Sequence, residues 1–89
     1  MIMKFTTDSM KDSLHNLAND IYANCATKPT FHLQQLLYEL ADAYRIERYG
    51  YKSVLVLPQD LKGTYAYITA VIIYDEKDNM LECIKLIGG

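Results

Sequence analysis

The chain has 89 residues, of which 51% are hydrophobic and 22% charged, and its net charge at pH 7 is −2. A chain of this length forms one domain with a small core, and its many patterned apolar residues exclude a disordered protein. No segment carries the basic excess that is typical of nucleic-acid-binding proteins. The charge therefore argues against nucleic acid as the main partner, although it leaves that partner open.

Targeting and cysteine signals indicate a cytoplasmic protein. Residues 1–4 lack the apolar core of a secretory signal, and the longest nearly apolar run, 66–74, is too short to cross a membrane. Cys25 and Cys83 lie far apart and match no metal-ligand spacing. We expect both thiols to be reduced and buried, with a bridge between them as the alternative.

The first helix is predicted over about 9–25, with Asp8 or Ser9 as its N-cap. Residues 1–7 precede it and alternate in the manner of a short first strand. The helix carries one apolar stripe, made of Met10, Leu14, Leu17, Ala18, Ile21 and Cys25.

The second helix is predicted over about 30–49. Pro29 suits the start of a helix, Thr27 or Thr30 is the expected cap, and Gly50 can adopt the positive φ of a helix stop. Its apolar face is expected to contain Leu33, Leu36, Leu37, Leu40 and Tyr44. The short connection predicts an antiparallel helix pair.

Three strands are predicted after the helices, over about 52–57, 64–74 and 80–87. The middle one, TYAYITAVIIY, is apolar on both faces, which is typical of a central strand. We expect a loop over 58–63 and a polar turn over 75–79. These short connections predict an antiparallel meander, and the whole chain is predicted to be a two-layer α+β domain of the type (β)ααβββ.

The sheet is predicted to have more apolar surface than two helices can cover. The uncovered face would expose Val, Ile or Tyr side chains, and 52–57 would be an apolar edge strand. We expect a homodimer or a protein partner on the open face or the edge; alternatively, the helices and the N-terminal segment wrap enough of the sheet. The candidate interface residues are Tyr65, Tyr67, Val71, Ile73, Val54 and Val56.

Catalytic and ligand-binding motifs are not evident. The sequence contains no nucleophile elbow, P-loop, dinucleotide-binding glycine motif or HExxH motif. His15 and His32 stand at no metal-ligand spacing from Cys, Asp or Glu. We therefore expect a non-enzymatic protein with no catalytic residue, no metal and no cofactor.

One basic and aromatic cluster is visible, made of Arg45, Arg48, Lys52, Tyr49 and Tyr51. Such a cluster could contact phosphates and stack on bases. In the structural alternative, the arginines neutralise the end of the second helix and the tyrosines are half-buried. The acidic overall charge favours the structural alternative.

Two segments resemble toxins of the RelE/ParE type. Residues 5–14, FTTDSMKDSL, resemble their strand-to-helix entry, and residues 71–88, VIIYDEKDNMLECIKLIG, resemble their closing hairpin. The resemblance implies the toxin fold, in which members that cleave mRNA use basic and acid–base side chains on these strands. Position 71, often arginine in that family, is Val71 here, and the toxins tend to be basic, so no catalytic residue is carried over.

These patterns favour a small cytoplasmic protein that binds another protein, such as an inhibitor or accessory factor of the kind that phages and mobile elements encode. The alternatives are a nucleic-acid-binding regulator that uses Arg45, Arg48 and Lys52, and a degenerate toxin-like protein.

Overall fold

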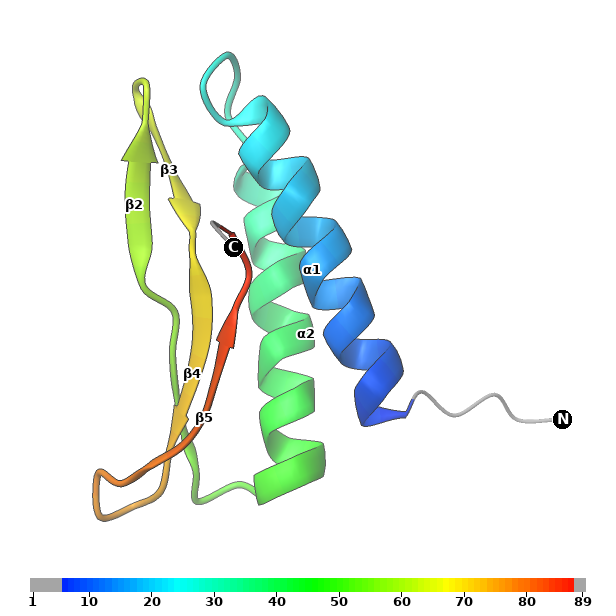
Figure 1. The fold of residues 1–89 in the computed structure, drawn as a ribbon, viewed down its shortest axis with the longest axis vertical. Helices are drawn as coiled ribbons and strands as arrows, with labels where there is room; N and C mark the ends of the chain where they lie inside the picture. Colours follow the sequence, from blue (N-terminus) through cyan, green and yellow to red (C-terminus); the bar gives the residue numbers. More distant parts are fainter. Residues whose placement is uncertain (1–5, 88–89) are drawn as a thin grey trace, which may run out of the picture.

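The computed structural model describes residues 6–87 and has two layers (Figure 1). Its elements are α1 (Thr7–Asn24), α2 (Phe31–Tyr49), β1 (Val54–Val56), β2 (Gln59–Lys62), β3 (Tyr65–Ile68), β4 (Ala70–Tyr74) and β5 (Met80–Lys85). Both helices lie on the same side of the strands (Figure 1). The predicted α+β class and the helix pair are confirmed.

The helix ends follow local chemistry, with one correction at the start of α1. Its N-cap is Thr6, because the Thr6 hydroxyl accepts a hydrogen bond of 3.1 Å from the Ser9 N–H. Asp8 lies in the first turn, where the helix dipole favours a negative charge. Of the strand expected over 1–7, residues 1–5 lie outside the described residues.

The second helix matches its expected boundaries. It begins after Thr30, and its last turn is closed by the Gly50 N–H, which donates to the Ile46 carbonyl. Gly50 has a φ of 91°, a conformation that favours glycine. The glycine stop of α2 is therefore confirmed, whereas Thr30 occupies the N-cap position without a side-chain capping hydrogen bond.

The strands form a three-stranded antiparallel sheet with β4 in the centre, in the order β1–β4–β5, and a separate two-stranded ribbon of β2 and β3. The segment 58–63, expected to be a loop, contains β2 and a turn at Gly63, whose φ is 64°. Asp60 pairs with Tyr67 and Lys62 with Tyr65. Polar residues are accommodated in this strand because three of its four residues are exposed.

The long strand expected over 64–74 is interrupted at Thr69. Two residues lie between Val56 and Gln59, whereas three lie between their pairing partners Ile72 and Ile68. The additional residue produces a β-bulge. Pro58 lies opposite it and has no N–H to complete the ladder, but its carbonyl accepts the Thr69 N–H at 2.9 Å.

The core lies between the helices and one face of the sheet. Its largest fully buried side chains are Tyr44, Leu14, Ile21, Leu37, Ile73, Val71 and Cys25. Most of the predicted helix stripes lie in or against this core. Leu36 is the exception, at 49% exposed, because the buried face of α2 is centred on Leu37, Ala41 and Tyr44 and leaves Leu36 on its flank.

We expect two adjacent isoleucines of β4 to respond differently to truncation. Ile73→Ala should lower the free energy of unfolding by about 2–5 kcal/mol, because it leaves a cavity beneath the helices. Ile72→Ala, on the other face, should cost much less. Urea denaturation measures both, and equal losses would contradict the assignment of the two faces.

Candidate functional site

The three-stranded sheet has one face without a helix over it (Figure 1). Strand pairing places Val54 beside Tyr74, and Val56 beside Ile72, which in turn pairs with Cys83. Val54 is 47% exposed and Val56 40% exposed. We call these five residues the open face, and they form an apolar surface across all three strands.

Cys83 differs from its expected burial. It is exposed because Glu82 and Ile84, on either side of it, point toward the helices, and successive strand residues alternate between faces. Cys25 is fully buried, as expected, and neither thiol is in a disulfide. The open face therefore carries a free, accessible thiol.

The candidate interface residues are divided between several environments. Val71 and Ile73 are fully buried beneath the helices, which corrects their assignment to an interface. Tyr65 and Tyr67 are half-buried and pack against the core, which removes them from the open face. Val54 and Val56 remain exposed, so the uncovered face of the sheet is the one opposite Val71 and Ile73.

Tyr22 of α1 explains where the β2–β3 ribbon packs. The Tyr67 ring meets the Tyr22 ring edge-on, with 5.1 Å between their centroids. Lys62 Nζ lies 3.7 Å from the Tyr22 ring centroid and donates to the Tyr22 carbonyl at 3.1 Å. The aromatic pair and the cation–π contact together hold the ribbon against the end of α1.

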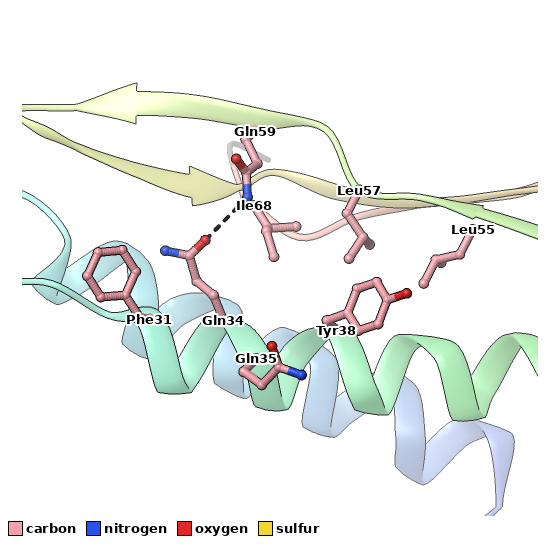
Figure 2. A pocket seen from close by; sticks show the side chains of 8 residues that line it. All are labelled: Phe31, Gln34, Gln35, Tyr38, Leu55, Leu57, Gln59 and Ile68. Carbon is pink, nitrogen blue, oxygen red and sulfur yellow. Dashed lines mark hydrogen bonds between the residues drawn. The ribbon is translucent and has the colours of Figure 1, made fainter.

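A groove of about 310 Å³ runs between α2 and the neighbouring strands (Figure 2). It is lined by Phe31, Gln34, Gln35, Tyr38, Leu55, Leu57, Gln59 and Ile68. Figure 2 shows Leu57 and Ile68 pointing from the strands toward α2. Phe31 is 75% exposed and Tyr38 49% exposed, so the helix side of the groove presents two aromatic rings to solvent.

Amides hold one part of this groove together. Gln34 Nε2 donates to the Ala66 carbonyl at 3.0 Å. Figure 2 shows the neighbouring bond, in which Gln59 Nε2 donates to Gln34 Oε1 at 3.4 Å. The rest of the groove lies beside β1, which is an edge strand of the sheet. Sequence reasoning identified the apolar edge but missed the helix side, because the i, i+3, i+4, i+7 spacing of Phe31, Gln34, Gln35 and Tyr38 includes two polar residues.

The basic cluster is built into the fold. Arg45 has only 12% of its side chain exposed and makes a 2.7 Å ion pair with Asp42. Its Nη1 also donates to the Ser53 carbonyl at 2.6 Å, which holds the connection between α2 and β1. Arg48 Nε lies 3.5 Å from Glu82 Oε1. These contacts favour the structural interpretation. The side chains of Lys52 and Tyr51 are exposed, and the Tyr51 carbonyl accepts from Arg45 Nη1 at 3.4 Å.

Glu82 is the charged centre of the helix–sheet interface. Its Oε1 accepts hydrogen bonds of 2.7 Å from the hydroxyls of both Tyr44 and Tyr49, and its Oε2 lies 3.1 Å from Lys11 Nζ. The sequence places the Glu82 carboxylate on the same strand face as Ile84, and a buried carboxylate requires hydrogen-bond donors. Only the fold identifies those donors.

The electrostatics of Glu82 follow from these contacts. Burial by itself raises the pKa of the Glu82 carboxyl, but hydrogen bonds from Tyr44, Tyr49 and Lys11 bring that pKa below its ordinary value. Burial and the neighbouring carboxylate raise the pKa of the Tyr44 hydroxyl. The cluster is therefore a carboxylate held by the hydroxyls of Tyr44 and Tyr49 and by Lys11 Nζ, and it connects β5 to both helices.

Neither a metal-binding cluster nor a membrane-spanning helix is found among residues 6–87. They contain no group of three or more His, Cys, Asp or Glu side chains that could hold a metal ion. Neither described helix combines the length and apolar character needed to span a membrane. Comparisons with protein-family models, curated proteins and solved structures find no match, so the resemblance to RelE/ParE toxins stays a prediction.

The Glu82 cluster predicts a defined pH dependence of stability. Glu82→Gln should lower the free energy of unfolding at pH 7 by about 2 kcal/mol, because it removes the charge from three donors. A carboxyl whose pKa is lower in the folded state stabilises above its unfolded pKa, and this contribution is lost as pH falls through its folded pKa. The difference from the native chain should therefore narrow in acid, as measured by urea denaturation between neutral and acidic pH.

Glu76→Gln is the matched control, because Glu76 is an exposed carboxylate in the turn before β5. It should leave the pH profile nearly unchanged. If Glu82→Gln and Glu76→Gln behaved alike, the Glu82 carboxylate would contribute nothing specific to the fold.

Proposed function

We propose that this chain is a non-enzymatic protein-binding module and that its open face is the binding surface. The observation that supports this proposal is the exposure of Val54 and Val56 beside Ile72, on a sheet face with no helix over it. Monomeric soluble proteins rarely expose large contiguous apolar patches, and patches of this kind mark interaction sites. The proposal includes a cytoplasmic location and a role as an inhibitor or accessory factor.

The chemistry of the open face indicates the kind of partner that it would bind. The side chains of its five residues are aliphatic or aromatic, apart from the Cys83 thiol and the hydroxyl of Tyr74, and the exposed Lys85 borders them on the same side of β5. Tyrosine is enriched in protein interfaces because it combines apolar area with one hydrogen-bonding group. A partner with a complementary apolar surface would be favoured over a highly charged one.

Catalysis is not part of the proposal, because Glu82 and Tyr44, whose pKa values are shifted, stabilise the contact between β5 and α2. Glu82 and Tyr44 satisfy one another between β5 and α2. A catalytic carboxylate would need to face substrate, whereas Glu82 has only 16% of its side chain exposed. The cluster therefore supports a scaffold whose function is presented on another surface.

Cys83 allows a direct test of this proposal. A benzophenone maleimide should react with Cys83, because Cys25 is fully buried. On irradiation in a lysate of the source cells, the label should crosslink the chain to a specific cellular protein. Val54→Asp should abolish this product, because it places a charge on the open face, and mass spectrometry of the product identifies the partner.

The control carries the same label on the exposed residue Asn16 of α1, as Asn16→Cys with Cys83→Ser. This variant should give a different pattern of products. Identical products from both positions, or a product that Val54→Asp leaves unchanged, would show that the open face is not the binding surface.

A further inference from the structure

The outer edge of β1 is a second unoccupied surface, and it is distinct from the open face. Within residues 6–87, β1 pairs with β4 on one side and with no strand on the other. Edge strands are commonly protected by charges or proline, and β2 has Asp60, Lys62 and the preceding Pro58. Val54–Val56 has no such protection.

Alternation along β1 identifies the backbone groups on this edge. The Pro58 carbonyl points toward the paired strand, because it accepts the Thr69 N–H. Successive residues of an antiparallel strand direct their N–H and C=O groups to opposite sides, so Val54 and Val56 also direct theirs toward β4. The N–H and C=O groups of Leu55 and Leu57 therefore point outward.

The edge ends at Ser53, whose backbone groups are already used. The Ser53 carbonyl accepts from Arg45 at 2.6 Å, and its N–H donates to the Gly50 carbonyl at 3.3 Å. If Leu55 paired with Leu55 of a second copy, Ser53 would lie opposite Leu57 of that copy and would have to bond to it through these same N–H and C=O groups. A strand that pairs Leu55 with Leu57 requires only groups that are free.

We propose that a second copy of this chain pairs antiparallel with β1 about a twofold axis at Val56. Leu55 of each copy then pairs with Leu57 of the other, which completes roughly four backbone hydrogen bonds. This proposal concerns the edge of the sheet and does not depend on the function proposed for the open face.

The charges around β1 are complementary in this register. Val56 lies opposite its own copy, Val54 opposite Pro58, and Lys52 at the level of Asp60 of the other copy. Lys52 and Asp60 are both exposed, so their side chains are available to pair. The twofold axis creates this pair twice, and no like charges meet along the paired segment.

The groove provides the second layer of the same contact. Strands of a sheet lie about 4.8 Å apart and packed helices about 8–10 Å apart, so a helix covers roughly two strands. The α2 helix covers β1 incompletely, which leaves Leu55 and Leu57 half-buried in the groove. A second copy would bring its own α2 alongside and cover the exposed rings of Phe31 and Tyr38.

Disulfide trapping tests the register. Residues opposite each other in a non-hydrogen-bonded antiparallel pair have Cα atoms about 4.5 Å apart, within the range that a disulfide spans. Val56→Cys with Cys83→Ser should therefore form a covalent dimer under mild oxidation. Val54→Cys with Cys83→Ser is the matched control and should crosslink far more slowly, because Val54 faces Pro58. Equal rates, or no dimer from Val56→Cys, would overturn the proposed register.

Light scattering over a dilution series tests the dimer itself. The native protein should have a mass in solution of twice 10.2 kDa, the mass of one chain. Lys52→Glu and Asp60→Lys should each weaken the dimer at least several-fold, and the two together should restore it. A chain that stays monomeric, or a dimer that responds to neither reversal, would overturn the proposal. So would dissociation by Cys83→Arg alone, because that result would place the second copy on the open face.

Discussion

The carboxylate of Glu82 connects the sheet to both helices, through Lys11 of α1 and through Tyr44 and Tyr49 of α2. A charge that is mostly buried is stable only where donors surround it, so the helices are held over the sheet face to which Glu82 points. The position of the helices also decides which side chains of the neighbouring strands are buried. Val71 and Ile73 share that face and enter the core, whereas Val54 and Val56 remain outside.

The number of helices among the described residues sets the second constraint. Two helices cover one face of a three-stranded sheet, and the described chain supplies no further element for the other face. The same shortage leaves the outer side of β1 open beneath α2. The open face and the β1 edge are perpendicular, so a second copy on the edge would join two open faces into one larger continuous surface for a partner.

The bulge at Thr69 divides one long hairpin into two parts that pack differently. On one side of it, β2 and β3 pack against Tyr22 and carry charged residues that protect an outer strand. On the other side, β1 and β4 belong to the sheet and present apolar residues. Pro58 lies opposite the bulge and limits the unprotected edge to a short segment, which suits a specific pairing better than open-ended association.

The helices were predictable from local chemistry, since Pro29, Gly50 and apolar spacing all act within a few residues. The caps were less predictable, because Thr6 rather than Asp8 or Ser9 caps α1 and the Thr30 side chain makes no capping hydrogen bond. Short connections also placed the three main strands in order. The orientation of the strand over 64–74 was not predictable, because both of its faces are apolar and alternation alone cannot say which one is buried. Only tertiary contacts, chiefly those of Glu82 with α1 and α2, decided that Val71 and Ile73 lie inside and that Cys83 and the two valines of β1 face the solvent.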